Sequence, residues 1–177
     1  MLTINIKSRA HNEITDYFIF PAKWNVIQNK LYAFYSAKDT IANQPEAKTI
    51  CGSLNGRLFE PRTVELYNKV FNVAKQEGMI YFWLGIQETS PAKTYVYISD
   101  KKTLDWNNFD KNEPNDNTNG PYNDCGKVIN DREKLGLWDD KNCKGPKLPF
   151  ICEIMSGISF NNCFCHITNN STLISKR

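Results

Sequence analysis

Oxygen-bearing side chains gather in three short segments of this chain, each beside a proline, a cysteine or a tryptophan. Calcium takes about six to eight oxygen ligands from carboxylates, side-chain amides, backbone carbonyls and water. Side chains from three segments nearly fill such a shell, so the pattern predicts a calcium site. The segments are Glu113-Pro114-Asn115, Asn123-Asp124-Cys125 and Trp138-Asp139-Asp140, the last followed by Cys143.

The distribution of charge favours the same chemistry. Residues 105–140 hold nine acidic and four basic side chains, whereas the rest of the chain holds ten acidic and eighteen basic ones, for a net charge of +3. Clustered carboxylates repel one another unless water or a cation screens them, so the acidic segment favours a hard metal ion. The basic residues elsewhere are scattered and form no long run, which is typical of a solvated surface and argues against a nucleic-acid site.

A framework of helices and strands must bring the three segments together. Apolar side chains recur at helical spacing between Thr63 and Gly78, and Pro45 suits the first turn of an earlier helix. The polar segment 99–124 is an irregular loop by composition, and loops of this length are usually functional. The predicted helices are 43–55 and 63–78, and the predicted strands are 24–36 (a pair), 79–86, 94–98, 127–129, 136–138 and 147–154.

Several motifs occur in an order that is typical of one known family. They are Trp83-Leu84-Gly85-Ile86, Trp106, Glu113-Pro114-Asn115, Trp138-Asp139-Asp140, Cys143 and Ile151-Cys152-Glu153. Through them the chain resembles the C-type lectin family over residues 21–154, which leaves an N-terminal arm, 1–20, that we expect to be poorly ordered, and a C-terminal tail, 155–177. The resemblance implies an α+β fold in which two helices flank antiparallel sheets, with a long calcium-binding loop.

The resemblance also assigns roles to the three segments. It implies that Glu113, Asn115, Asn123, Asp139 and Asp140 hold the primary calcium ion, with a cis peptide bond before the proline of the triplet. All of these except Asp140 are expected to bind sugar as well. Two neighbouring sugar hydroxyls complete the calcium shell and exchange hydrogen bonds with its acid and amide ligands.

The type of sugar is an open question in this sequence. Glu113-Pro114-Asn115 is typical of sites for mannose, glucose, N-acetylglucosamine or fucose. However, Asn123 and Asp139 stand where such sites usually have Glu and Asn, so a donor and an acceptor have changed sides. We therefore hypothesise that galactose is accepted. If another residue of the loop fills the place of Asn123, the mannose interpretation holds.

An auxiliary calcium site is a further expectation from the resemblance. Glu88, Asp116 and Asp124 stand at the positions that family members often use for it. The set is incomplete, because a fourth acid is expected near Ala92 and Glu88 is one carbon longer than the usual Asp. The three tryptophans of the motifs, by contrast, are expected to pack in the core and not to stack on sugar.

Six cysteines indicate disulfide bonds. None of them has the Cys-x-x-Cys spacing of a zinc ribbon or a thioredoxin-like site, and disulfides are typical of an oxidising, extracellular setting. The resemblance implies the pairs Cys51–Cys152 and Cys125–Cys143. Cys163 and Cys165 have no place in the pattern. They either pair with each other or pair with another chain, and the second choice would produce a disulfide-linked homo-oligomer.

We expect a secreted protein that binds glycans. No stretch approaches the roughly 18 apolar residues of a membrane helix, so no membrane insertion is predicted. Residues 1–20 are broken by charged side chains and lack the apolar region of a signal peptide, so an export signal is expected to have been removed. A role in innate recognition of microbial glycans fits these features.

Other functional classes were weighed against sugar binding. A calcium-independent protein-binding module of the same fold is the main alternative, although the retained set of acids and amides argues against it. An ice- or mineral-binding derivative is another. Cys165-His166 does not indicate an enzyme, because adjacent residues rarely converge on one reacting atom and no third catalytic member is present.

Overall fold

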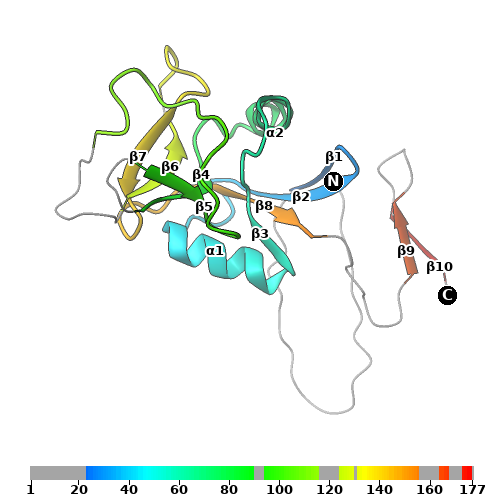
Figure 1. Cartoon of the computed structure of the whole chain (residues 1–177). Helices are drawn as coiled ribbons and strands as arrows, with labels where there is room; N and C mark the ends of the chain where they lie inside the picture. Colours follow the sequence, from blue (N-terminus) through cyan, green and yellow to red (C-terminus); the bar gives the residue numbers. More distant parts are fainter. Residues whose placement is uncertain are drawn as a thin grey trace.

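The computed structural model describes residues 23–89, 94–115, 124–129, 131–155, 164–167 and 173–176. Within them, two helices accompany a large sheet, and two further strands form a sheet of their own (Figure 1). The helices are α1 (Gln44–Ser53) and α2 (Val64–Gln76), and the strands are β1 (Lys23–Ile27), β2 (Lys30–Tyr35), β3 (Gly56–Leu58), β4 (Trp83–Thr89), β5 (Thr94–Tyr97), β6 (Asp124–Val128), β7 (Trp138–Asn142), β8 (Phe150–Ile154), β9 (Phe164–Ile167) and β10 (Leu173–Lys176).

The large sheet brings distant parts of the chain together. Its strand order is β1-β2-β8-β4-β6-β7, with β3 added beside β8 and β5 added beside β4. Every pair is antiparallel except β4 with β8. The pairing of β2 with β8 places Leu31 opposite Ile154, so the two ends of the domain lie side by side. This arrangement confirms the predicted α+β class.

Helix α1 is fixed through its first residues. The side chain of Asn43 accepts a hydrogen bond from the Glu46 N–H at 3.0 Å, and the Glu46 carboxylate accepts one from the Asn43 N–H at 3.1 Å, which forms a capping box. The buried Gln44 amide then donates to the carbonyls of Leu84 and Ile86, each at 2.9 Å. These two bonds hold the start of α1 against β4.

Helix α2 supplies one wall of the main core. The side-chain oxygen of Thr63 accepts the Leu66 N–H at 3.1 Å and begins the helix at the predicted cap. One face of the helix is buried among the aromatic residues that surround Trp138. Its members are Leu66, Tyr67, Val70, Phe71 and Ala74.

Two disulfides connect elements that are far apart in sequence. Cys51–Cys152 joins α1 to β8 across 101 residues, and Cys125–Cys143 joins β6 to the turn after β7 across 18 residues. They are the pairs that the resemblance implies. Closing loops of these lengths restricts the unfolded chain by about 5 and about 3 kcal/mol in the chain-entropy model. The shorter one braces the two strands that carry the candidate ligands.

The structure departs from the sequence expectations in several elements. Strand β4 begins at Trp83 and not at Met79, because the Met79 N–H donates to the Ala74 carbonyl at 2.8 Å and closes the end of α2. Strand β3 has only three residues, too few for a recognisable alternation, and was not predicted. Strands β9 and β10 were also not predicted; they pair within the predicted C-terminal tail.

Two further expectations concern the N-terminal arm and membrane insertion. The predicted arm, 1–20, lies outside the described residues. In the part of the chain that the structure describes, neither helix has the length and apolar composition that a membrane crossing requires.

Gly85 gives a direct test of the packing between β3 and β4. A Cβ atom there would lie 2.6 Å from the Leu58 carbonyl oxygen and 3.1 Å from that of Phe59, both backbone atoms that cannot move aside cheaply. We therefore expect Gly85→Ala to lower the free energy of unfolding by about 1–3 kcal/mol, measured by urea denaturation.

Gly52→Ala is the matched control, because no atom lies within 4 Å of the added methyl group and the residue is in α1. This change should raise the free energy of unfolding by up to about 1 kcal/mol. Equal effects at the two glycines would contradict the assigned packing.

Candidate calcium site

The irregular segment that leads to Glu113 is fastened to β7 by backbone hydrogen bonds. The Trp138 N–H donates to the Asn108 carbonyl at 2.8 Å, and the Asp110 N–H donates to the Trp138 carbonyl at 3.0 Å. The Asp110 carbonyl in turn accepts the Glu113 N–H at 2.8 Å. One residue of β7 therefore fixes the position of the segment that carries Glu113.

Aromatic packing holds that residue of β7 in place. Trp138 is fully buried, and its ring centroid lies 4.9 Å from that of Trp106, 5.4 Å from that of Tyr67 and 5.7 Å from that of Phe109. Trp83 is also fully buried, whereas Trp106 is partly buried against the core. These tryptophans are core residues, as the sequence predicted. The contact between Trp106 and Trp138 helps to hold β7 in place at the site.

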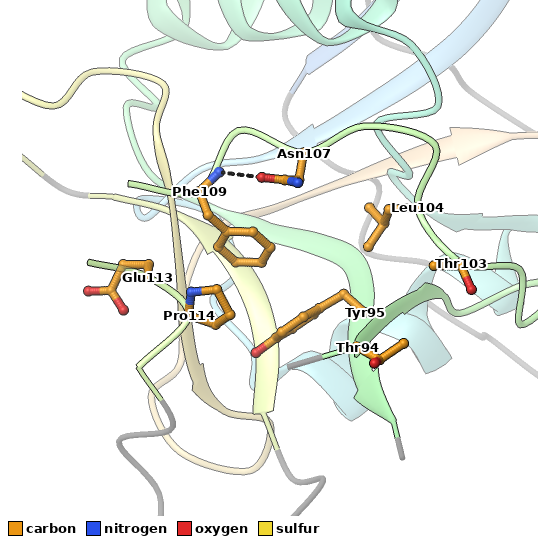
Figure 2. A pocket seen from close by; sticks show the side chains of 8 residues that line it. All are labelled: Thr94, Tyr95, Thr103, Leu104, Asn107, Phe109, Glu113 and Pro114. Carbon is orange, nitrogen blue, oxygen red and sulfur yellow. Dashed lines mark hydrogen bonds between the residues drawn. The ribbon is translucent and has the colours of Figure 1, made fainter. Parts of the chain in front are cut away.

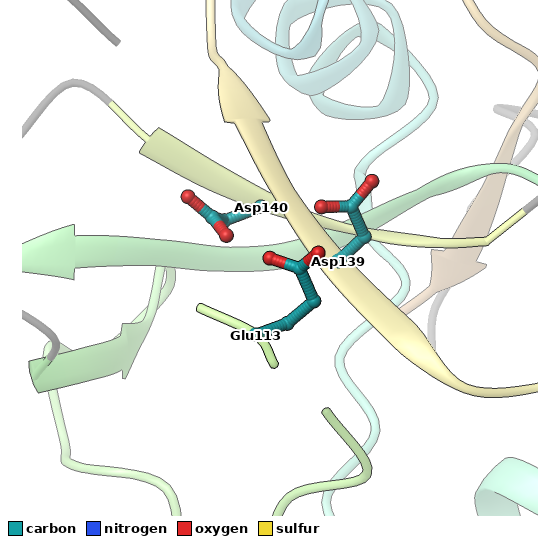
Figure 3. A group of neighbouring side chains, drawn as sticks. All are labelled: Glu113, Asp139 and Asp140. Carbon is teal, nitrogen blue, oxygen red and sulfur yellow. The ribbon is translucent and has the colours of Figure 1, made fainter. Parts of the chain in front are cut away.

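Three carboxylates meet where the segment and the strand come together. Glu113, Asp139 and Asp140 each offer an oxygen atom within 4.8 Å of the other two. Figure 3 shows the Glu113 carboxylate between the two aspartates. The peptide bond between Glu113 and Pro114 is cis, as the resemblance implies. Two oxygens bound to one calcium ion at about 2.3–2.6 Å are at most about 5 Å apart, so a single ion can reach all three.

Asp140 connects the two sides of this cluster. Its side chain is fully buried, and its Oδ1 accepts the backbone N–H of Asn115 at 2.9 Å. The side chain of Asn115 is exposed beside it. The Asn115 end of the triplet is therefore tied to β7 by this bond, and the Glu113 end is held by the bond from its N–H to the Asp110 carbonyl.

Lys127 is a member of the cluster that the sequence analysis missed. It faces Asp139 across the β6–β7 pair, and its Nζ lies 2.6 Å from Asp139 Oδ2, with the two side chains 13% and 16% exposed. Three carboxylates and one ammonium leave a charge of −2 when all are ionised. Only strand register brings this lysine to the site, so nothing in its local sequence separates it from the other lysines.

The chemistry of the cluster fits a divalent cation that prefers oxygen ligands. Among the described residues, Oε2 of Glu113 and Oδ1 of Asp139 are buried and accept no hydrogen bond. Buried carboxylate oxygens normally have a donor or a cation against them. Calcium would satisfy both atoms and balance the charge of −2.

Comparison with known proteins agrees with this geometry. The family model of the Lectin C-type domain matches residues 40–154, which is more than half of the chain. The chain belongs to the C-type lectin family. The matched range includes all three segments of the site and both disulfides.

Individual relatives of this C-type lectin domain are distant in sequence. C-type lectin mosGCTL-7 of Aedes aegypti is 24% identical over 124 residues, which cover 67% of this chain and 81% of that protein. Among solved structures, the complex of SPL-1 with GlcNAc has a TM-score of 0.64 at 23% identity and covers 78% of this chain and 96% of that one. A Ca²⁺-dependent type II antifreeze protein has a TM-score of 0.61 at 18% identity, covering 76% and 99%. The structural likenesses show the shared fold.

The other predicted ligands are placed only in part. Asn123 and Asp116 lie outside the described residues. Glu88 and Asp124 are buried on the adjacent strands β4 and β6, each next to one of the paired residues Gln87 and Cys125. Among the described residues, the only group of three potential metal-ligating side chains is the one at Glu113. The auxiliary calcium site therefore stays a prediction.

A pocket of about 440 Å³ lies beside the triplet. In Figure 2 the rings of Tyr95, Phe109 and Pro114 face this pocket, whereas the carboxylate of Glu113 points away from them. The Pro114 ring thus faces the pocket, whereas the Glu113 carboxylate lies with those of Asp139 and Asp140. The rest of the lining is Thr94, Thr103, Leu104 and Asn107.

The carboxylate cluster changes the acidity of Glu113. Burial is the main cause, followed by the negative charges of Asp139 and Asp140, and together they raise the pKa of Glu113 from 4.5 to about 7. Below about pH 7 Glu113 is therefore mostly protonated in the calcium-free site. A bound cation would take the place of that proton.

This raised pKa predicts an unusual pH dependence of stability without calcium. Between about pH 4.5 and 7 the folded chain keeps a proton on Glu113 that the unfolded chain has released, so the free energy of unfolding should fall as pH rises through this window. Urea denaturation in chelator at several pH values measures this. Glu113→Gln should remove most of the fall, and an equal fall in both proteins would contradict the assignment.

Proposed function

We propose that this C-type lectin domain binds sugar through a calcium ion held by Glu113, Asn115, Asn123, Asp139 and Asp140. The observation that carries the proposal is the meeting of three carboxylates within 4.8 Å, two of which have a buried oxygen without a donor among the described residues. Calcium would supply a centre to which two neighbouring sugar hydroxyl oxygens bind. Two solved structures of similar fold support a sugar ligand: the complex of SPL-1 with GlcNAc, and the cow CD23 carbohydrate-recognition domain in the presence of a GlcNAc2Man3 oligosaccharide.

The residues of this chain divide the work of recognition. Asp140 is fully buried, so it is suited to bind the metal ion but not to contact the sugar. Glu113 and Asp139 are partly exposed, and Asn115 is exposed. The lone pairs and N–H groups of these side chains that calcium leaves free can contact sugar hydroxyls. Such a shallow site makes few apolar contacts, so we expect weak binding by one domain and tighter binding by several copies.

The biological setting is part of the same proposal. The two disulfides fit a secreted protein. Recognition of microbial glycans suits a weak site that gains strength from multiple copies. A disulfide through Cys163 or Cys165 would supply such copies; Cys163 lies outside the described residues, and the backbone of Cys165 is in β9.

Calcium binding can be tested by removing one charge from the site. Asp140→Asn keeps the size of the side chain and an oxygen for the Asn115 N–H, but removes a carboxylate ligand. We expect calcium affinity, measured by isothermal titration calorimetry, to fall at least about tenfold. Calcium-dependent retention on a glycan array should disappear with it, as it should for the wild type in chelator.

Asp105→Asn is the matched control. Asp105 is exposed in the irregular segment before Glu113, is not part of the cluster, and loses the same charge when changed. Its calcium affinity should stay close to that of the wild type. Sugar binding that persists in chelator would reject the calcium mechanism, and a wild type that binds neither calcium nor sugar would favour the calcium-independent protein-binding module.

Sugar preference is a separate prediction. Since Asp139 supplies an acid where mannose-type sites usually have an amide, we expect galactose to compete for binding. Competition experiments with free mannose and free galactose on the immobilised domain measure it. Clear competition by mannose with none by galactose would show that the Glu113-Pro114-Asn115 triplet alone decides the preference.

A further inference from the structure

The two oxygens of the Asp139 carboxylate have different surroundings. Oδ2 is bound to the ammonium of Lys127 at 2.6 Å. Oδ1 is buried and accepts no hydrogen bond within the described residues, while the residue belongs to the cluster with Glu113 and Asp140. Asp139 thus lies between an ammonium and the proposed calcium position.

A hydroxyl group that reaches Asp139 needs both an acceptor and a donor. A hydroxyl oxygen that binds metal through one lone pair still has a proton to give and a second lone pair to fill. A carboxylate only accepts hydrogen bonds. Asp139 can therefore accept one from the hydroxyl, but it cannot donate one to the second lone pair of the hydroxyl oxygen. The ammonium of Lys127 has three N–H groups, of which Asp139 Oδ2 occupies one.

The position of Lys127 is suited to this second role. A hydroxyl that donates to Oδ2, the oxygen that the ammonium already binds, would lie within a few ångströms of Lys127 Nζ. Lys127 is 13% exposed, which leaves it partly open while the β6–β7 register holds it opposite Asp139. Its stem is therefore held in place before any ligand arrives.

We propose that Lys127 and Asp139 together bind one sugar hydroxyl, with Lys127 donating the hydrogen bond that the carboxylate cannot supply. This inference rests on the proposed function, since it assigns a residue within the same sugar site. It makes Lys127 a specificity-determining residue, because the ammonium requires an acceptor lone pair at that hydroxyl and favours extra negative charge nearby on the sugar.

The assignment predicts opposite changes in two affinities when the ammonium is removed. Lys127 repels a calcium ion bound by the same carboxylate, so its loss should strengthen calcium binding. Its loss should also weaken sugar binding, because the hydroxyl loses a charge-assisted donor. A residue that only supported the packing of β6 would change both affinities in the same direction.

Lys127→Met tests this, since it keeps the length of the stem and removes the charge. Calorimetry should show calcium affinity raised at least about threefold, and titration with methyl galactoside and methyl mannoside at saturating calcium should show sugar affinity lowered about tenfold. Lys111→Met is the matched control, because Lys111 is exposed in the irregular segment before Glu113, is not paired with Asp139, and loses the same charge. It should leave both affinities near the wild-type values.

Lys127→Arg separates the missing donor from a packing defect. It leaves Asp139 unchanged and places charged N–H donors beside it. Sugar affinity at saturating calcium should stay closer to the wild-type value than in Lys127→Met. An equal loss in both variants would assign the loss to packing and overturn the proposal.

Two further outcomes would also overturn it. Unchanged sugar affinity in Lys127→Met would mean that another donor, such as Asn123, makes the hydrogen bond to this hydroxyl without Lys127. A fall in both the calcium affinity and the sugar affinity would indicate that Lys127 has a structural role. Failure of the proposed function looks different, because the wild type itself would then show no calcium-dependent binding of either methyl glycoside.

Discussion

The candidate site depends on the backbone hydrogen bonds between Trp138 and the irregular segment that precedes Glu113. Trp138 exchanges one bond with Asn108 and one with Asp110, and Asp110 holds the N–H of Glu113. Because the Trp138 side chain is packed among other rings, the strand cannot shift along its axis without opening the core. The same residue therefore positions the ligands on both sides of the cluster.

This arrangement holds like charges together, which folding must compensate. The buried Asp140 accepts an N–H from Asn115, Asp139 is paired with Lys127, and the raised pKa of Glu113 allows a proton to remain there. Each of these offsets part of the repulsion without a metal. These three features allow the carboxylates to stay close together in the metal-free protein, at the site proposed for calcium.

Much of the fold and part of the site could be predicted from sequence. Helix α1 follows from Pro45 in its first turn, and α2 follows from the Thr63 cap and the apolar spacing after it. Strands β1, β2, β4, β5 and β8 follow from runs of apolar, aromatic and β-branched residues. The cysteine pairs and the three oxygen-rich segments follow from resemblance to the family. Short elements such as β3 could not be predicted, because they are stabilised by pairing with a distant strand and not by a local pattern.

The sequence by itself determined the chemistry that is available: carboxylates and amides in three segments, cysteines to brace them, and a family pattern that joins them. Only the tertiary structure decided which of these groups meet. Glu113 and Asp139 are neighbours because a buried tryptophan holds the irregular segment, and Lys127 joins them because antiparallel register places it opposite Asp139. Cross-strand neighbours depend on long-range pairing, which the order of residues along one segment does not specify.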